Sequence, residues 1–448
     1  MTTANPPESH RHDAVVVGGG PTGATAALVL ARAGLDVAVV ERARFPRFHV
    51  GESLLPGNMP LLRELGLDEG LHRVPHILKR GVEFAWGHEE ESQLFSFADG
   101  LLVAEATTIN VERAPFDAHL LAAARAAGAR VDEGAAARRI LRLDDDGGEV
   151  AVADGDGRAE RTVRARILLD ASGQTTFVGK HLGSRRVLPD LRKVAYFGHF
   201  RNVDRLPRGR EGDPTLVMMR DGWFWSIPLD AERTSIGLVL DQEAARLAGV
   251  APDRMLAWGI ARCPFLRRRT AAAIFPPSNG VAADFSYRCE PYAGPGYFLV
   301  GDAATFVDPI FSTGICLGMM GAVKAAEAVL AIRAGADPER ARRRYVRFVE
   351  HGSAPFFRLV RQYYDPAFRD LLMEGRGPLG IHRAVLSVLA GFVFPRPVFA
   401  LRWRLRLFDF LVACQRHFRL VPPRQARSLL EMAAVGAGVE PSRPPLEQ

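Results

Sequence analysis

Cysteine is scarce in this chain, and the few cysteines are scattered. Four occur in 448 residues, far apart and without any C-x-x-C pair, at Cys263, Cys289, Cys316 and Cys414. This spacing excludes a disulfide framework and a zinc knuckle. It fits a reducing cytoplasm, in which a free cysteine behaves as a small buried hydrophobic residue. We therefore expect a cytoplasmic protein without a metal site.

Membrane-spanning and export signals are also missing. No run of about eighteen uncharged apolar residues occurs. Residues 1–13 lack the basic and then apolar pattern of a signal peptide. Because 48% of the residues are apolar, the chain can bury a substantial core. We expect a soluble globular protein with no integral membrane segment.

Lysine is absent from residues 351–448, although this segment is strongly basic. It holds 14 arginines and seven acidic residues, which accounts for the whole net charge of +7. A solvated helical face, the docking of an acidic partner and contact with an anionic membrane surface all explain such a cluster. No nucleic-acid-binding motif accompanies the arginines, so we do not expect a nucleic-acid partner.

The first fifty residues have the pattern of a dinucleotide site. Residues 14–17 form a short apolar run typical of a buried parallel strand. Gly18, Gly20 and Gly23 follow in the G-x-G-x-x-G register and open a helix. These glycines permit a tight turn, close approach of the backbone to a pyrophosphate, and close packing of the helix on the sheet.

A second strand completes this unit. It covers residues 35–40 and ends in Glu41, about twenty residues beyond the glycines, where a carboxylate accepts from a ribose hydroxyl. Two later strands also end in acids, Asp170 in D-A-S-G and Asp302 in G-D-A. We expect these strand ends to add phosphate or ribose contacts.

The glycine fingerprint, the D-x-S-G element and the late G-D-A together resemble the flavin monooxygenase superfamily. Arg113 precedes A-P-F-D and matches the R-x-x-F-D element of that superfamily. The resemblance implies FAD, bound by a Rossmann-like domain of the p-hydroxybenzoate hydroxylase (GR2) type in an α/β fold. It further implies that Arg113 contacts the FAD.

Three further motifs resemble those of the flavin-dependent halogenases. The first is H-V-G-E-S-L-L-P at 49–56, which contains the expected cofactor contact Ser53. The second is W-x-W-x-I-P, with Trp223, Trp225, Ile227 and Pro228. The third is F-x-x-P-x-x-S-x-G, with Phe306, Pro309, Ser312 and Gly314. Read alone, the tryptophan motif is equally an aromatic core strand. Within the family the two tryptophans would keep the substrate away from the flavin.

Lys79 stands where these halogenases carry their essential lysine, before Gly81 and a strand ending in Trp86. The chemistry needs a lysine in a dry tunnel, because desolvation shifts its pKa and the group can then hydrogen-bond hypohalous acid or be chlorinated by it. If the match to the family motif is shifted by one residue, Arg80 takes the place assigned to Lys79.

The turn before residue 315 has the features of an anion site. Ser312, Thr313 and Gly314 feed a helix whose N-terminal amides attract anions, and the resemblance places the halide at Thr313 and Gly314. Tryptophan halogenases carry a glutamate just before this turn, whereas this chain has Phe311. The form resembles the halogenases of phenols and pyrroles, several of which act on substrates tethered to carrier proteins. Because such carriers are generally acidic, we expect Arg402, Arg404 and Arg406 to be candidate docking residues.

The sequence therefore predicts an FAD-dependent halogenase of phenol or pyrrole type that uses reduced FAD, oxygen and chloride or bromide in secondary metabolism. A separate reductase would supply reduced FAD, since no second dinucleotide fingerprint occurs. We expect an FAD-binding domain in two parts, an interleaved β-rich substrate domain and a helical C-terminal region, at residues 12–190 and 291–335, 191–290, and 336–448.

Three other functions are compatible with the same residues. A flavin monooxygenase would hydroxylate its substrate and ignore halide. A prenyl-lipid reductase shares the G-E-S-x-x-P stretch, and the basic C-terminus would then contact a membrane. A flavin-binding protein without activity would show no turnover with any electron donor.

Overall fold

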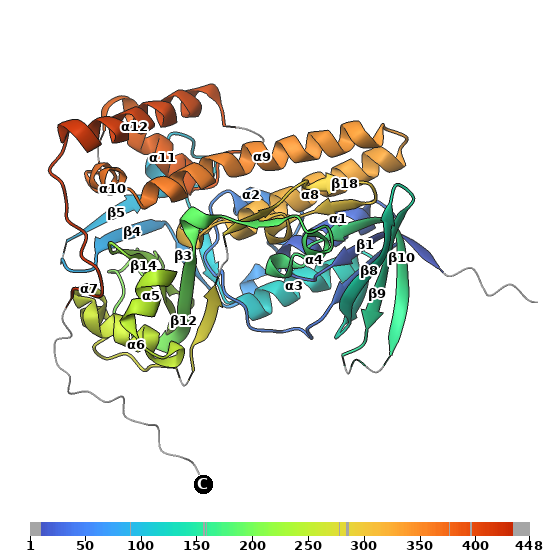
Figure 1. The fold of residues 1–448 in the computed structure, drawn as a ribbon, viewed down its shortest axis with the longest axis horizontal. Helices are drawn as coiled ribbons and strands as arrows, with labels where there is room; N and C mark the ends of the chain where they lie inside the picture. Colours follow the sequence, from blue (N-terminus) through green and yellow to red (C-terminus); the bar gives the residue numbers. More distant parts are fainter. Residues whose placement is uncertain are drawn as a thin grey trace, which may run out of the picture.

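The computed structural model describes residues 10–432, apart from positions 90, 156, 158, 277, 284, 285, 376, 395 and 396. The proline-rich tail beyond Val439, which we expect to fray, lies outside this range. Two sheets lie side by side, and a helical layer covers one edge of both (Figure 1).

The first sheet is built around the predicted N-terminal strand. β1 (Arg11–Val17) pairs in parallel with β2 and β10, which pair in turn with β7 and β19. The other strands of this sheet are β2 (Val37–Glu41), β7 (Arg130–Glu133), β8 (Ala136–Asp144), β9 (Gly147–Ala153), β10 (Glu160–Asp170), β18 (Ala293–Gly294) and β19 (Tyr297–Leu299). Because the central strands are parallel, their carboxyl ends meet at one edge, where cofactors bind in such sheets.

Helices α1 (Pro21–Arg32) and α3 (Arg113–Ala126) pack against this sheet, and α8 (Gly314–Arg333) packs on α1. By length and composition alone, α8 is apolar enough to cross a membrane. Half of it is buried, and it packs between α1 and α9. Its apolar character therefore follows from a place in the core.

The second sheet is mostly antiparallel and has the order β16-β12-β15-β14-β13-β4-β5. Its strands are β4 (Gly81–Trp86), β5 (Ser92–Ser96), β12 (Lys193–Arg201), β13 (Thr215–Met218), β14 (Gly222–Pro228), β15 (Arg233–Asp241) and β16 (Gly280–Ala283). The N-terminal strands β4 and β5 thus join strands from the middle of the chain, as the interleaved arrangement predicts.

One stretch differs from the prediction. Residues 242–269, which we expect to be mostly β, form α5 (Gln242–Ala248), α6 (Pro252–Arg262) and α7 (Pro264–Arg269). Proline at the first turn of α6 and of α7 favours these starts. Their apolar faces cover the outer side of the second sheet through Met255, Leu256 and Phe265.

Smaller elements connect the two sheets. β3 (His76–Lys79) pairs with β6 (Thr108–Val111), and three short strands, β11 (Arg185–Val187), β17 (Tyr287–Cys289) and β20 (Thr305–Phe306), form another sheet. The short helices α2 (Asn58–Glu64) and α4 (Phe177–His181) lie in the first half of the chain.

The C-terminal region is helical, as predicted. Its helices are α9 (Pro338–Tyr363), α10 (Pro366–Met373), α11 (Ile381–Leu389) and α12 (Phe399–Phe418). α9 runs along the top of the molecule from the first sheet to the second, and α10 to α12 stack over the second sheet (Figure 1). All four cysteines are free, and three are buried while Cys414 is partly exposed.

Candidate active site

The glycine turn at the end of β1 has no room for side chains. Gly18 has φ +103°, and a Cβ there would lie 2.4 Å from the carbonyl oxygen of Ala171. A Cβ on Gly23 would lie 1.9 Å from the carbonyl oxygen of Gly18. The N-cap of α1 is Gly20, which offers no side-chain acceptor, so the first amides of the helix face the turn.

Two arginines lie beside this turn and share one buried carboxylate. Arg113 donates to both oxygens of Asp117, at 2.7 and 2.9 Å, and Arg47 donates to the same carboxylate at 3.2 Å. A Cβ on Gly20 would lie 3.4 Å from the Arg47 guanidinium. The Asp117 carboxylate thus holds the guanidinium groups of Arg113 and Arg47, and that of Arg47 lies next to Gly20. The net positive charge of the three side chains suits a pyrophosphate.

Glu41 shapes the same turn. One of its carboxylate oxygens accepts from the backbone N–H of Gly19 at 2.6 Å, and the other from that of Ala43 at 2.8 Å. Each oxygen keeps a further lone pair, so the predicted contact with a ribose hydroxyl stays compatible with this geometry.

The two strand-end acids play different parts. Asp170 is buried and accepts from the N–H groups of Ser172 and Val178 at 3.0 and 2.7 Å, so it holds its own loop together. Asp302 follows β19, and burial raises its pKa to about 6, although the Arg113 charge acts against this rise. Of the two acids, Asp302 is the one whose charge interacts with Arg113.

These groups fit FAD. The glycines let the turn at the end of β1 close tightly, and two arginines and the α1 amides supply positive potential beside it. Residues Gly18, Gly20, Gly23, Glu41, Arg47, Arg113 and Asp302 would hold the cofactor.

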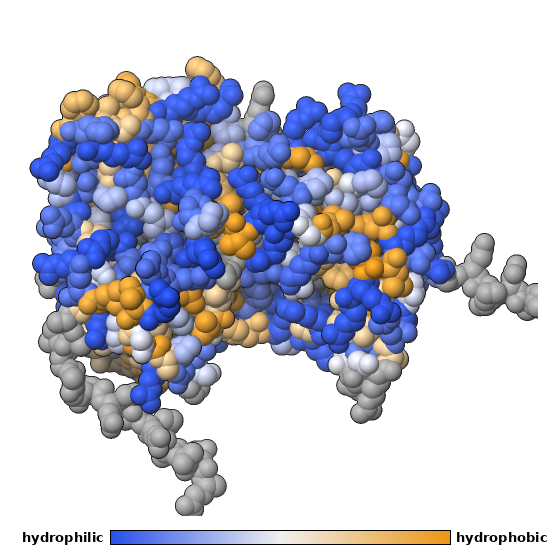
Figure 2. All heavy atoms as spheres, in the orientation of Figure 1, coloured by the Kyte–Doolittle hydropathy of each residue, from blue (hydrophilic) through white to orange (hydrophobic). Residues whose placement is uncertain are grey.

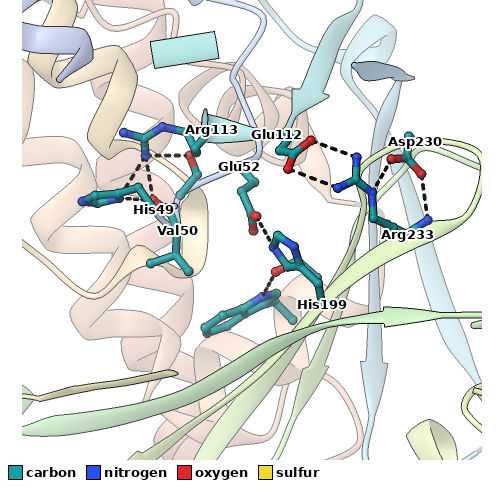
Figure 3. A network of polar contacts seen from close by, with 11 residues as sticks. His49, Val50, Glu52, Glu112, Arg113, His199, Asp230 and Arg233 are labelled. Atoms are coloured by element: carbon teal, nitrogen blue, oxygen red, sulfur yellow. Dashed lines mark hydrogen bonds and ion pairs between the residues drawn. The ribbon is translucent and has the colours of Figure 1, made fainter. Parts of the chain in front are cut away.

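The segment at residues 45–57 connects Arg113 to the second sheet (Figure 3). Arg113 donates to the carbonyl oxygens of Val50 and Gly51, at 2.6 and 3.2 Å. Two residues beyond Val50, the buried Glu52 pairs with His199 of β12 at 2.5 Å. The segment is therefore fastened on one side to Arg113 and on the other to the second sheet.

Lys79 lies at the break where the chain passes from β3 to β4. The carboxylate of Asp213 accepts from the N–H groups of Arg80 and Gly81, at 2.6 and 2.9 Å, and so fixes the break. A Cβ on Gly81 would lie 1.8 Å from the carbonyl oxygen of Phe95, which makes glycine necessary there. This local geometry orients Lys79 into the interior.

The Lys79 side chain is 3% exposed. Its Nζ donates to Ser53 Oγ at 2.9 Å and to the carbonyl oxygen of Leu54 at 3.0 Å, and it lies 5.2 Å from the centre of the Phe97 ring. Burial lowers the pKa of Lys79 to about 7, and the Asp213 charge opposes this only in part. The structure thus places Ser53, expected at the cofactor, against Lys79.

The tryptophan motif lies on β14 with both indoles buried. The ring centres of Trp223 and Trp225 are 5.7 Å apart. Trp225 covers Gly237, whose Cβ would lie 2.1 Å from the indole, and its Nε1 donates to Ser235 at 3.1 Å. Ile227 and Pro228 are also buried. The aromatic pair therefore forms a fixed wall on the substrate sheet.

Asn110 ties this wall to the lysine. It lies on β6, the partner strand of the one that carries Lys79, and its Nδ2 donates to the carbonyl oxygens of Gly212 and Pro228 at 2.7 and 2.9 Å. Lys79 and the end of the tryptophan motif are thereby held in one frame.

The turn before α8 adopts a sharp conformation. Ser312 has φ +55°, Thr313 is buried at the N-cap, and Gly314 begins the helix. A Cβ on Gly314 would lie 3.6 Å from the Asp302 carboxylate, which brings this turn next to the cofactor acid. The position of Phe311 is also clear: its buried ring packs edge-on against Tyr363 at 6.0 Å.

Asp308 and Tyr364 support this turn from behind. The Asp308 carboxylate accepts from the N–H of Ile310 at 3.1 Å and from the Tyr364 hydroxyl at 2.6 Å. Burial raises the pKa of Asp308, and the Trp223 indole lies beside the carboxyl. The residues Phe306 and Pro309 flank this support at half-buried positions.

Known proteins with similar sequences support an FAD site at this position. The FAD binding domain family matches residues 11–212. A tryptophan 2-halogenase of Chondromyces crocatus is 36% identical over 72% of this chain and 61% of its own length. A 1H-pyrrole-2-carbonyl-(peptidyl-carrier protein) brominase of Pseudoalteromonas luteoviolacea is 32% identical over 72% of this chain and 78% of its own. The chain belongs to the flavin-dependent halogenases.

Solved structures of halogenases have the same fold as this one. The flavin-dependent brominase Bmp2 superposes with a TM-score of 0.79 at 28% identity, covering 90% of this chain and all of its own. The myxobacterial chondrochloren halogenase CndH gives 0.73 at 30% identity, over 93% and 98%. The halogenase described here therefore binds FAD through the Rossmann-like domain that its glycine fingerprint predicts.

Sequence reasoning missed four residues of this halogenase's site. Arg47, Asp117, Asn110 and Asp213 act through partners distant in sequence, such as the 70-residue separation between Arg47 and Asp117. Only Asp117 carried a signal, as the acid of the R-x-x-F-D element.

Proposed function

We propose that this halogenase transfers chlorine or bromine to a pyrrole or phenol ring presented on a carrier protein. The observation that carries the proposal is the buried Lys79, which donates to Ser53 and Leu54 and whose partner strand β6 is joined through Asn110 to Pro228 of the tryptophan motif. A lysine without a salt-bridge partner is costly to bury and is kept where chemistry needs it.

When bound, reduced FAD would supply, together with oxygen, the oxidising equivalents that convert halide to hypohalous acid. The amides at Thr313 and Gly314 would hold the halide beside Asp302, since a helix N-terminus attracts anions. Trp223 and Trp225 would keep the aromatic ring away from the flavin, so that the substrate meets hypohalous acid rather than the oxidised cofactor.

Lys79 would then orient the hypohalous acid for electrophilic substitution. Two of its three N–H bonds are already used by Ser53 and Leu54, and the third remains to donate to the oxygen of the acid. That donation makes the oxygen a better leaving group as the ring attacks the halogen.

The substrate class is inferred from the halide turn and from two of the relatives, whereas the Chondromyces crocatus relative is named for tryptophan. Phe311 supplies no carboxylate beside the turn, which disfavours a free tryptophan and suits a ring reactive without a base. Two relatives, the brominase above and a chlorinase of Pseudomonas fluorescens at 28% identity over 90% of its length, are named for a pyrrole-2-carbonyl group on a peptidyl carrier protein.

Three finer points stay predictions. A separate flavin reductase would supply reduced FAD, because the sequence carries one dinucleotide fingerprint. A cytoplasmic location fits the four free cysteines. The domain boundaries at residues 190, 290 and 335 also stay a prediction.

The test is an assay of purified protein with FAD, a flavin reductase, NADH, oxygen and bromide or chloride, read by mass spectrometry over free and carrier-bound pyrroles and phenols. We expect a halogen isotope pattern that disappears in Lys79→Ala while FAD stays bound. The matched control is Arg80→Ala, which removes the neighbouring cation and should leave most activity.

Other products would contradict the proposal. A gain of oxygen alone, insensitive to halide and to Lys79→Ala, would identify a hydroxylase on this fold. Equal losses in both variants would remove the special role of Lys79.

A further inference from the structure

The outward face of α12 combines aromatic rings with unpaired positive charge. Phe399 is 72% and Phe410 62% exposed, and Arg402 and Arg406 lie exposed between them. Spacings of three and four residues put all four on one side of the helix. Figure 2 shows apolar side chains at the corner of the molecule that α12 occupies in Figure 1, with hydrophilic ones between them.

Negative charge is missing from this face. The one acidic residue of α12, Asp409, accepts from Arg358 at 2.9 Å and from Gln362 at 2.7 Å, both on the neighbouring α9. Neither Arg402 nor Arg406 has an ion pair with any residue in the described ranges. The face therefore presents a net positive surface with aromatic rings, as interfaces for acidic partners do.

Arg404 has a different role from the one expected for it. Its Nε donates to the carbonyl oxygen of Leu379 at 2.7 Å, and its Nη1 to that of Ala400 at 2.9 Å. The docking set is therefore smaller than the sequence suggests. Arg404 instead fastens α12 to the loop that precedes α11.

That loop is the rim of a cavity of about 520 Å³ between β5 and α11. Gly375, Gly377 and Gly380 line one side, and His382 lines another with its Nε2 buried and without a hydrogen-bond partner in the described structure. These three glycines present only backbone to the cavity, which is also lined by the side chains of Gln93, Asp99 and Arg383.

The cavity ends close to the catalytic lysine. Phe95 and Ser96 of β5 line it, and the next residue, Phe97, lies with its ring 5.2 Å from Lys79 Nζ. Arg383 of α11 donates to the carbonyl oxygens of Asp99 and Gly100, both at 3.2 Å, and so holds the Phe97 loop in place. A group entering here is separated from Lys79 by the Phe97 loop.

We propose that the outward face of α12 is the docking site of an acidic carrier domain, and that the cavity beside it holds the pantetheine arm up to the Phe97 loop, which has to move for the substrate to reach Lys79. The proposal rests on the proposed function. Positive charge selects an acidic partner, and the cavity selects one with a long flexible arm. A membrane surface would use the same aromatic and basic side chains but has no use for the cavity.

The test compares two forms of one substrate. The probes are pyrrole-2-carbonyl loaded on a panel of holo peptidyl carrier proteins and the same acyl group on free pantetheine. The variant is Arg402→Glu with Arg406→Glu. The matched control, Arg246→Glu with Arg254→Glu, changes the net charge equally on the exposed surfaces of α5 and α6, at the opposite end of the second sheet (Figure 1).

We expect the α12 variant to raise the KM for the best carrier substrate roughly tenfold at low salt, with kcat and the KM for the pantetheine thioester unchanged. The difference should shrink as salt screens the charges. The control variant should behave like the wild type in both assays.

Three results would overturn the proposal. The first is equal kinetics of the two variants. The second is halogenation of the free thioester with no turnover of any loaded carrier, which would leave the halogenase function intact. The third is loss of binding to phosphatidylserine vesicles in the α12 variant without any change in carrier kinetics, which would identify a membrane contact. No halogenation of either substrate form, with FAD bound and reduced, would refute the proposed function itself.

Discussion

Replacing Lys79 by methionine should abolish halogenation and, at neutral pH, make the protein more stable. The side chain of methionine fills a similar volume without a charge. In the folded protein burial lowers the pKa of Lys79 from 10.5 to about 7, so the charged form is less favourable there than in the unfolded chain. The site therefore costs the protein stability at every pH at which the unfolded lysine is charged.

The size of this effect follows from the two pKa values. The shift corresponds to about 5 kcal/mol when both states are fully protonated, and to about 4 kcal/mol at pH 7, where half the folded molecules have lost the proton. Methionine also loses the hydrogen bonds to Ser53 and Leu54, which costs about 2 kcal/mol. A net gain of about 2 kcal/mol in the free energy of unfolding remains.

At alkaline pH the change in unfolding free energy caused by Lys79→Met should have the opposite sign. Between pH 7 and pH 10.5 the unfolded state binds more protons than the folded state, so the penalty fades and wild-type stability rises with pH. At pH 10 only about 1 kcal/mol of the penalty remains. The lost hydrogen bonds then outweigh it, and Lys79→Met should be the less stable protein by about 1 kcal/mol.

Urea unfolding at pH 7 and pH 10, with saturating FAD in both samples, measures these differences directly. Lys193→Met is the matched control, because Lys193 is equally buried but paired with Asp241. Its loss should destabilise the protein at pH 7, since Asp241 and the buried Asp308 then lose the positive charge beside them. Equal destabilisation of Lys79→Met at both pH values would refute the reasoning that Lys79 carries a desolvation cost.

Three further predictions concern Lys79 and the residues that support the proposed halide and cofactor sites. Because Lys79 should donate as an ammonium group, kcat should fall as the pH rises through about 7, and a rise instead would indicate that the free amine reacts. Tyr364→Phe removes a donor to Asp308 and should raise the KM for halide roughly tenfold, with little change in kcat at saturating halide or in FAD affinity; an unchanged KM would mean that the halide turn needs no support. Asp117→Asn releases both cofactor arginines and should weaken FAD binding at least tenfold by flavin fluorescence, whereas unaltered binding would place the diphosphate elsewhere.

Local patterns in the sequence were sufficient for the elements that carry the cofactor and the lysine. The apolar run before Gly18, the helix after it and the strand ending in Glu41 depend on short-range periodicity and on the special backbone freedom of glycine. The same holds for the strand after Lys79, where Gly81 marks a break at which a side chain would collide with Phe95. The predicted role of each site residue stays a prediction that the assays above address.

Helical segments inside the second half of the chain show the limit of such patterns. Residues 242–269 lie between strands and contain short apolar clusters, so their helices are decided by packing on the outer face of a sheet formed elsewhere. The basic C-terminus shows the same limit. Arg402 and Arg404 are two residues apart, yet one remains free and the other is bound to the carbonyl oxygen of Leu379.

The sequence by itself determined that this chain binds FAD and carries the motifs of a halogenase, because those signals lie within single turns, strands and helix starts. Only the tertiary structure decided which charges meet. Asp117 accepts hydrogen bonds from both Arg47 and Arg113. Asn110, on the partner strand of the one that carries Lys79, donates to Pro228 at the end of the tryptophan motif. Arg383 of α11 donates to the loop that carries Phe97. These contacts join residues far apart in the chain, and their free energy comes from burial that no local pattern specifies.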